Sequence, residues 1–524
     1  MPRRSVSGRA GSFPRFRALL ALFVVLLLAP ALAAQQVDVA ALDAYFAKAQ
    51  AEWPVPGLSV AIVKDGRIVF EKGYGVRDIR GHDPADEHTL YAIASNSKAF
   101  TAAALAQQVD AGKLSWDDRV LDHLPWFRLY DEYITQEIRI RDLLSHRSGL
   151  GTYSGDLLWY GTPYSAEEVV RRARFLPQAY PFRAGYGYSN LMFIAAGEVL
   201  RAVTGQDWHD YVESSFFTPL GMTRSVTSTN DLPTRDNVAT PHKVEAGRTL
   251  PIDWYNWDAV GAAGGVISSV HDMAQWMNAQ LAAGQGDGVR LFSEARQREM
   301  WSVQNPLAVS PGYQERYPST HFRGYGMGWS LNDYLGRKVM SHGGGYDGMY
   351  SQVALVPEEG LGVVVLTNGM TGVAPALVYR VLDAYLGGEP RDWSAEGLPG
   401  WEESRVAFEA RQAAFERSKI AGTRPSLELS VYEGTYGGEF YGDATVTLEE
   451  GRLVLRLLPN PDLVADLEHL HYDTFLLRWR ENLAWFGTGA ATFVLDGAGN
   501  AAEMKLDVPN DDLWFYELEL KRRR

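Results

Sequence analysis

The stretch Ser-Asn-Ser-Lys at residues 95–98 opens an alanine-rich segment that runs to Asp110 and has the composition of a helix. Side chains three positions apart lie on one face of a helix, so the Ser95 hydroxyl and the Lys98 amine can meet. A serine hydroxyl is a weak nucleophile, and a lysine can be its base only where the environment lowers the lysine pKa. Lys98 is the only lysine with a serine three positions before it. The pair is a candidate nucleophile and base, although the letters alone also suit an ordinary helix start with a surface lysine.

A second candidate element is Tyr-Ser-Asn at 188–190, and Tyr188 is the only tyrosine with asparagine two positions later. A phenol held near cations can act as a phenolate that relays a proton or activates water. Asn190 can accept a hydrogen bond from Lys98 and donate one to a substrate carbonyl. By itself, the stretch also suits a loop in which Ser189 or Asn190 caps the next helix.

A third candidate element is the run His342, Gly343, Gly344 and Gly345, which follows a strand predicted at 338–341. Glycines let a substrate backbone approach a strand edge, and an N–H there can complete an oxyanion hole. His342 would supply a hydrogen bond or a positive charge. In isolation, the run also suits a glycine bulge in a hairpin.

The order of these elements, Ser-x-x-Lys, Tyr-x-Asn and then His-Gly-Gly on a late strand, resembles the serine β-lactamase-related family. That family includes class C β-lactamases, D-alanyl-D-alanine carboxypeptidases, D-aminopeptidases and related esterases. The resemblance covers residues 38–390, and Leu-Leu-Ser-His-Arg-Ser-Gly-Leu at 143–150 and Gly-Ala-Ala-Gly-Gly at 261–265 support it. The tail from Leu427 is similar to the small lipocalin-like β domain that often follows such hydrolases.

The resemblance implies a role for each candidate residue. Ser95 would be the nucleophile, and Lys98 with Tyr188 would move protons. Asn190 would orient the substrate. The N–H groups of Ser95 and Gly345 would form the oxyanion hole, and the other residues of the glycine run would contact the substrate.

His342 stands where β-lactamases usually carry lysine, and a neutral imidazole anchors a substrate carboxylate less firmly. We therefore expect a serine hydrolase that forms an acyl-enzyme at Ser95 and cleaves amide or ester bonds of small peptides or esters, as D-amino-acid peptidases, amidases and esterases do. Action on β-lactams or peptidoglycan peptides, as a β-lactamase or D,D-carboxypeptidase, is an alternative. A non-catalytic peptide-binding protein is another. A further alternative makes the C-terminal β domain the functional unit.

The order of predicted elements indicates an α+β fold. Strands at both ends of the first region, with helices between them, suggest one antiparallel sheet flanked by helices plus a helical subdomain, as in β-lactamase/transpeptidase-like domains. Turn-punctuated alternating runs near the C-terminus indicate a small all-β barrel. Helices are predicted at 38–52, 95–110, 191–203, 270–281, 374–386 and 401–419, and strands at 58–63, 67–74, 338–341, 350–356 and 362–366.

The expected organisation has four parts: a signal peptide at 1–34, the hydrolase domain at 35–395, a helical connector at 396–425 and the barrel at 426–524. Five arginines, an apolar run at 18–28 and Ala-Leu-Ala at 31–33 are typical of an export signal. The protein is thus expected to be periplasmic or secreted, tethered only if the signal is not cleaved. No later segment is apolar enough to predict a membrane span.

The composition excludes some classes of binding partner and some kinds of catalytic chemistry. The net charge of −14 argues against nucleic acid, and the absence of cysteine excludes thiol nucleophiles and disulfides. We expect a small-molecule or peptide substrate and neither metal nor cofactor, and the oligomeric state stays open. His146 and His271 are interpreted as structural. Five aromatic residues are considered as cleft lining or, with more weight, as packing residues: Trp159, Tyr160, Trp254, Tyr255 and Trp257.

Overall fold

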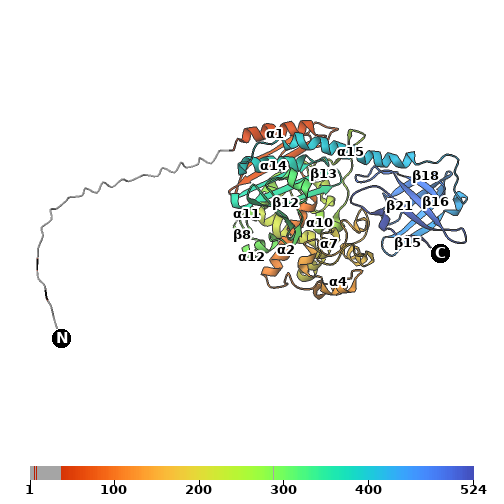
Figure 1. The fold of residues 1–524 in the computed structure, drawn as a ribbon, viewed down its shortest axis with the longest axis horizontal. Coiled ribbons are helices and arrows are strands. Elements are labelled where there is room, and N and C mark those ends of the chain that lie inside the picture. The colour runs from red at the N-terminus through yellow and green to blue at the C-terminus, as the bar shows by residue number, and fades with distance from the viewer. Residues whose placement is uncertain (1–4, 6–7, 9–36, 287, 524) are drawn as a thin grey trace. The chain divides into compact units, whose positions relative to one another are not determined.

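The computed structural model describes residues 37–286 and 288–523, together with Ser5 and Gly8 (Figure 1). The predicted export signal lies almost entirely outside these residues. The architecture below is that of the unit that begins at Val39. Among the described residues, no helix combines the length and apolar character needed to cross a bilayer.

The first region is built on one eight-stranded antiparallel sheet. Its strand order is β2-β1-β14-β13-β12-β11-β10-β9, so the first hairpin of the region pairs with its last strand, as the sequence predicts. Residues 65 and 66 turn this hairpin with φ values of 51° and 75°, as a tight two-residue turn requires. The strands are β1 (Gly57–Lys64), β2 (Arg67–Gly75), β9 (Asn305–Leu307), β10 (Arg323–Tyr325), β11 (Ser330–Tyr334), β12 (Arg337–Tyr346), β13 (Met349–Val356) and β14 (Leu361–Thr367).

The central strands are covered on both faces, which explains their continuous apolar sequences. Every residue of β14 is buried, and β1 is buried up to its last residue. Helices α1 (Val39–Glu52) and α14 (Val373–Leu386) contact one another over the sheet, and α11 (Val270–Leu281) packs on β1 and β14 (Figure 1).

The helical subdomain is centred on α2 (Ser97–Asp110), which is buried on nearly all sides. Its alanines allow close packing against α7 (Asn190–Thr204) and α10 (Gly261–Gly264). The Thr101 hydroxyl donates to the Ala262 carbonyl at 2.6 Å, which ties α2 to α10. A helix buried all round has little amphipathic pattern, so composition rather than periodicity predicts it.

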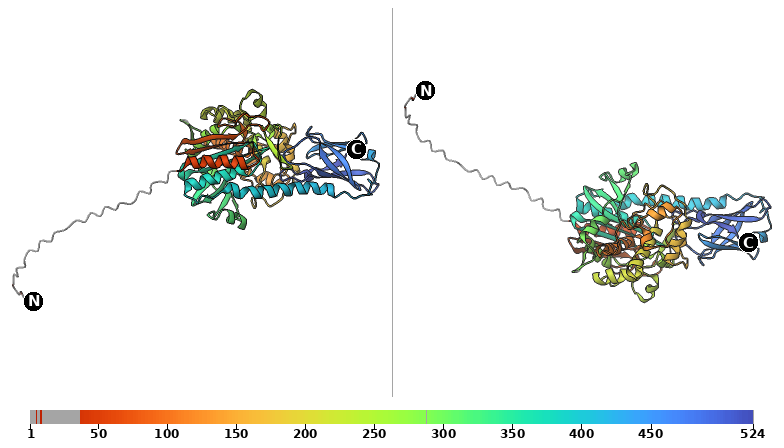
Figure 2. Two further views of the ribbon diagram at one scale, coloured as in Figure 1. Left: turned by 90° about the horizontal axis from the view of Figure 1, so that it is seen from above. Right: turned by 90° about the horizontal axis from the view of Figure 1, so that it is seen from below.

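The connector helix starts earlier than predicted. Helix α15 spans Trp393–Arg417 and contains Pro399, whereas the sequence suggested 401–419. Gly-Leu-Pro-Gly at 397–400 indicates a break, but the Asp392 side chain caps the true start by accepting from the Ala395 N–H at 3.1 Å. The helix packs on α14 and reaches the last region of the chain at β20 (Figure 2).

The last region is a closed eight-stranded antiparallel barrel, so the α+β fold followed by a small barrel is confirmed. Closure leaves no free sheet edge, and alternate side chains fill the interior. Its strands are β15 (Gly434–Gly438), β16 (Gly442–Glu449), β17 (Arg452–Leu457), β18 (Val464–His471), β19 (Thr474–Trp479), β20 (Gly489–Leu495), β21 (Ala501–Asp507) and β22 (Leu520–Arg522).

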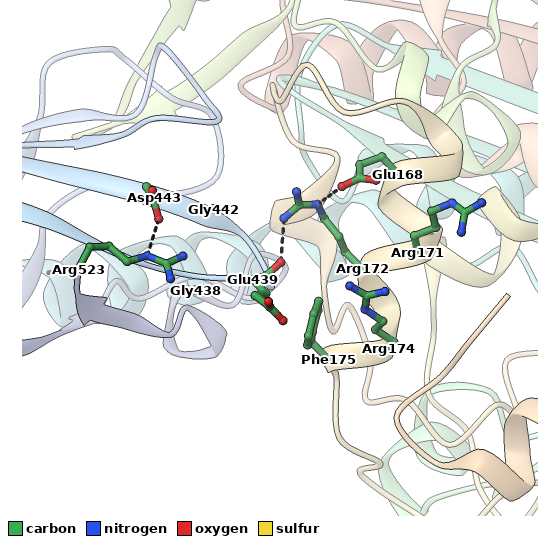
Figure 3. Close-up of a pocket in the computed structure, with 10 residues that line it drawn as sticks. All are labelled: Glu168, Arg171, Arg172, Arg174, Phe175, Gly438, Glu439, Gly442, Asp443 and Arg523. Atoms are coloured by element: carbon green, nitrogen blue, oxygen red, sulfur yellow. Dashed lines mark hydrogen bonds and ion pairs between the residues drawn. The ribbon is translucent and has the colours of Figure 1, made fainter. Parts of the chain in front are cut away.

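The barrel contacts the helical subdomain through polar groups. Arg172, on helix α6 (Ala166–Arg172), donates to the backbone carbonyl of Glu439 at 2.9 Å (Figure 3). It also donates to the carbonyl of Phe440, again at 2.9 Å. The Asn460 amide donates to the Tyr160 carbonyl, also at 2.9 Å. The barrel therefore adjoins the subdomain that carries the candidate motifs.

Candidate active site

Ser95 lies on a strained turn that leads into α2. The 3-10 turn Ala94–Asn96 (η1) precedes the helix, and Ala94 has a φ of 47°, in the left-handed region. Such a conformation costs about 1–2 kcal/mol for a residue with a side chain, so surrounding contacts must hold it. Ser95 is half-buried, and its N–H is one of the first in the turn, where no intrahelical acceptor is available. Its hydroxyl and N–H are thus both available to a ligand.

Lys98 is fully buried with three polar partners. Its Nζ atom lies 3.0 Å from Ser95 Oγ, 2.8 Å from Asn190 Oδ1 and 2.8 Å from the Ala263 carbonyl. Burial lowers the Lys98 pKa well below its usual range, against a weaker raising effect of Asp156. The Asn190 oxygen and the Ala263 carbonyl accept the two hydrogens of a neutral amine, whose lone pair then faces Ser95.

Asn190 accepts from Lys98 as expected, and one of its two amide hydrogens is engaged within the protein. Asn190 Nδ2 donates to Asp156 Oδ2 at 2.7 Å. The amide nitrogen carries a second hydrogen, and Asn190 lines the cavity, so a role in orienting the substrate stays a prediction. The first effect of this amide is to fix the orientation of the Lys98 amine.

Tyr188 lies just before α7, and its hydroxyl is close enough to Ser95 for the serine to lower the Tyr188 pKa, against the larger effect of burial. The Lys98 Nζ atom is 4.7 Å from the centre of its ring. Burial raises the Tyr188 pKa well above its usual range, so the phenol keeps its proton. The considered phenolate is thus disfavoured, because burial favours the neutral forms of both Tyr188 and Lys98.

His146 packs against Tyr188, which agrees with its interpretation as a structural residue. Its ring stacks on Tyr188 with a centroid separation of 4.1 Å, and its Nδ1 accepts from the Ser189 N–H at 3.0 Å. Burial lowers the His146 pKa well below its usual range, so the ring is a neutral platform.

The glycine run forms the end of β12 that faces the Ser95 turn. A Cβ at Gly344 would lie 2.1 Å from the Ile93 carbonyl oxygen, so only glycine allows this approach. In the antiparallel pairing with β13, Gly345 lies opposite Tyr350 next to the turn-closing pair Tyr346/Met349. Hydrogen-bonded and non-bonded pairs alternate, so the Gly345 N–H points away from β13. Gly343 and Gly345 line the cavity at Ser95, whereas Gly344 packs on the turn.

His342 does not present a positive charge. Its Nδ1 lies 2.6 Å from the Gly343 carbonyl oxygen and its Nε2 lies 2.9 Å from the Tyr325 hydroxyl. Nδ1–H therefore donates to the carbonyl, and Nε2 accepts from the phenol. Burial lowers the His342 pKa to about 3. Of the two roles considered for His342, a hydrogen bond is favoured over a positive charge, because an imidazole with an internal donor and acceptor is kept neutral.

The candidate residues share one cavity of about 240 Å³. Its lining includes Ser95, Tyr188, Asn190 and His342. Lys98 does not line it but contacts Ser95 through its Nζ atom. The barrel also contributes Trp485, Asp512 and Leu513, which sequence reasoning missed because they lie more than 380 positions after Ser95.

Three of the five aromatic residues considered as lining, Trp159, Tyr160 and Trp257, do form its wall. Trp254 and Tyr255 do not.

Two buried carboxyl groups were also missed. Asp347, just after β12, accepts from the Tyr160 hydroxyl at 2.8 Å and the Trp257 indole at 2.9 Å, and burial raises its pKa to about 6. Burial raises the pKa of Asp156, the partner of Asn190, to about 8. Neither aspartate belongs to a sequence motif, and only the fold distinguishes these buried acids from acidic residues on the surface.

Among the described residues, no group of three or more acidic or histidine side chains is arranged to hold a metal ion.

These features are those of the β-lactamase/transpeptidase class of serine hydrolase folds. Residues 42–386 match the family described as Beta-lactamase, and residues 418–522 match a "Domain of unknown function (DUF3471)". The chain belongs to the Beta-lactamase family.

Similar curated proteins include the unguisins hydrolase ungD' of Aspergillus campestris, 31% identical over 77% of this chain and 76% of the relative. Penicillin-binding protein 4 of Amycolatopsis lactamdurans is 30% identical over 64% of this chain and 86% of its own. Among solved structures, an octameric penicillin-binding protein homologue from Pyrococcus abyssi has a TM-score of 0.60 at 23% identity, covering 90% of this chain and 98% of that one. A D-stereospecific amidohydrolase from Streptomyces has a TM-score of 0.51 at 26% identity, covering 63% and 94%.

Proposed function

We propose that this protein is a serine hydrolase that cleaves amide or ester bonds of small substrates through an acyl-enzyme at Ser95. The observation that carries the proposal is the placement of the buried Lys98 amine 3.0 Å from Ser95 Oγ, with two acceptors that hold its hydrogens away from the serine. A neutral amine in this position is a base aimed at one hydroxyl.

In the first half-reaction, Lys98 takes the proton of Ser95 as Oγ attacks the substrate carbonyl. The N–H groups of Ser95 and Gly345 would stabilise the oxyanion, because both residues line the cavity, the first N–H begins a helical turn and the second points away from β13. The tetrahedral intermediate then collapses and expels the leaving group. Tyr188, which is protonated and lies beside Lys98 in the cavity, donates a proton to that group and recovers one from Lys98.

In the second half-reaction, a water molecule attacks the acyl carbonyl on the side that the leaving group has vacated. Tyr188 and Lys98 accept the proton of this water and return one to Ser95 Oγ, so the free enzyme is restored. The oxyanion donors serve again, because the second tetrahedral intermediate carries its charge on the same oxygen. No metal or organic cofactor takes part in these steps.

Peptide amides and simple esters are favoured over β-lactams as substrates. Neutral His342 offers a substrate carboxylate no charge, and its two nitrogens are bonded within the protein. The similar structure named D-stereospecific amidohydrolase supports amide substrates.

A substrate panel tests the proposal. Wild type, Ser95→Ala and Ser404→Ala, a control at an exposed position on α15, are assayed with p-nitrophenyl esters, D-amino-acid amides and nitrocefin. We expect Ser95→Ala to abolish turnover and fluorophosphonate labelling while its melting temperature stays near that of wild type, and Ser404→Ala to behave as wild type. Turnover that persists in Ser95→Ala would exclude the acyl-enzyme.

A further inference from the structure

Asp347 is a buried acid beside the active site that the proposed chemistry does not use. It lies in the turn at 347–348 that joins β12 to β13, two residues after Gly345, and it is 2% exposed. It is not among the described residues that line the Ser95 cavity. It lines a neighbouring cavity of about 440 Å³ instead, and Tyr160 lines both cavities. Any effect of Asp347 on a substrate must therefore act through other side chains.

Three aromatic side chains meet at Asp347 from separate parts of the chain. Its Oδ1 accepts from the Tyr160 hydroxyl at 2.8 Å, and its Oδ2 accepts from the Trp257 indole at 2.9 Å. The Trp485 indole, in the barrel loop between β19 and β20, is near enough to lower the Asp347 pKa, against the larger effect of burial. All three side chains line the Ser95 cavity. One carboxyl group thus joins a wall to which the hydrolase region and the barrel both contribute.

The direction of these donors decides what the wall presents to a substrate. Because Asp347 lies outside the Ser95 cavity, a ring whose polar edge points to it leaves carbon atoms toward the cavity. The six-membered ring of Trp485 illustrates this, since its Cη2 atom lies 3.4 Å from the position that a Cβ at Gly345 would take. The wall beside the proposed oxyanion residue is therefore apolar, and its shape depends on rings that share one acceptor.

Other contacts do not replace the carboxyl group. Among the described residues, neither the Tyr160 hydroxyl nor the Trp257 N–H has a second acceptor. A buried donor without a partner is costly, so loss of the carboxylate favours movement of the rings. Asp347 forms no ion pair in the part of the chain that the structure describes, and burial raises its pKa to about 6. The aromatic donors are thus what compensates its charge.

We propose that Asp347 is a positioning residue that fixes the aromatic wall of the Ser95 cavity and so sets the affinity for an apolar group beside the scissile carbonyl. It acts by holding the rings of Tyr160, Trp257 and the barrel residue Trp485. This inference rests on the proposed acyl-enzyme chemistry. It adds to that chemistry a residue that controls specificity without touching the substrate.

Boronic acids test this role, because Ser95 Oγ can add to the boron atom and each acid carries a single organic group. Phenylboronic acid is large enough to reach the wall, and methylboronic acid is the small reference. Both are measured at pH 8, where Asp347 is ionised, as inhibitors of p-nitrophenyl acetate hydrolysis. The measured quantity is the inhibition constant of the methyl compound divided by that of the phenyl compound.

We expect Asp347→Asn to lower this ratio by about tenfold, because its uncharged amide offers the donors one acceptor oxygen in place of two. The kcat for p-nitrophenyl acetate should stay within about twofold of wild type, since the catalytic residues keep their contacts. Asp253→Asn is the control. It removes the same charge from an exposed position that lines the neighbouring cavity, and it should keep the wild-type ratio.

Tyr160→Phe distinguishes positioning from a general structural role. It keeps the ring in the wall and removes only the hydroxyl that Asp347 accepts from, so it should lower the ratio in the same direction. In the double variant the combined loss should be smaller than the product of the separate losses, because both changes remove the same bond. Tyr160→Phe also keeps the inference testable if melting temperatures show that Asp347→Asn is unfolded.

Three results would overturn the inference: a wild-type ratio in Asp347→Asn, an equal fall in Asp253→Asn, or losses that multiply in the double variant. Failure of the proposed function gives a different result. In that case the wild-type enzyme neither hydrolyses p-nitrophenyl acetate through Ser95 nor is inhibited by either boronic acid. An enzyme that both acids inhibit with one ratio in every variant refutes only the role of Asp347.

Discussion

At the residue scale, the proposed chemistry depends on the protonation state of the Lys98 amine. The amine must be neutral to accept the Ser95 proton, so activity should fall when pH drops below the lowered Lys98 pKa and should be constant above it. We expect kcat/KM to reach its plateau well below pH 10.4, about where an ordinary lysine titrates. Lys98→Met, which keeps the volume without the amine, should lower kcat by about 10²–10⁴-fold. A rate that climbs up to pH 10, or a Lys98→Met enzyme near wild-type activity, contradicts this role.

The sequence predicts the chemistry-bearing residues better than their ionisation. Ser95, Lys98 and Tyr188 are recognisable because residue type and spacing are visible in the letters. The phenolate considered for Tyr188 and the cation considered for His342 are not favoured, because a pKa depends on burial that only the packed structure defines. Asp156 and Asp512 carry no motif at all, and their proximity arises from the packing of two regions distant in the chain.

At the scale of elements, the site depends on how closely β12 passes the Ser95 turn. A Cβ at Gly344 would meet the Ile93 carbonyl at 2.1 Å and Ser351 Oγ at 2.5 Å, so Gly344→Ala must displace the strand or the turn. We expect a destabilisation of about 1–3 kcal/mol, seen as a lower melting temperature, together with lower kcat. At Gly345 the nearest atom is 3.4 Å away, in Trp485, so Gly345→Ala should keep the wild-type melting temperature. Equal melting temperatures for the two variants would show that the contact at residue 344 is not tight.

Helices and strands with a regular hydrophobic periodicity are well predicted from the sequence. Those that contain glycine or proline against the usual propensity are not. The hairpin of β1 and β2 and the helix α11 occur where the turn letters and the periodicity indicate. The predicted start of α15 is eight residues too late, because the cap at Asp392 and packing on α14 outweigh the helix-breaking residues at 397–400. Strand β12 extends through the glycine run to Tyr346, because its pairing with β13 compensates for poor intrinsic propensity.

At the scale of the whole molecule, the barrel is part of the active-site cavity rather than an independent module. It supplies Trp485, Asp512 and Leu513 to the cavity wall. It also holds the loop that carries Asp156, because Glu517 accepts from the Ser154 hydroxyl at 2.5 Å and from the Gly155 N–H at 2.8 Å. The alternative in which the barrel alone is the functional unit gains no support from this arrangement.

This clamp gives the last prediction. Glu517→Ala removes both bonds to residues 154 and 155, so the turn that carries Asp156 gains freedom, and with it the Asn190 amide that orients Lys98. Two lost hydrogen bonds to a carboxylate, each of about 1.5–3 kcal/mol, exceed what is needed for a tenfold loss of kcat/KM, and we expect a loss of about that size. Glu519→Ala, at an exposed position two residues on, removes the same charge without touching the loop and should stay within about twofold of wild type. The two enzymes are compared on one p-nitrophenyl ester, with melting temperatures as the check on folding. If both lose activity equally, net charge rather than the clamp controls the site, and the barrel would be a neighbour of the catalytic residues without positioning them.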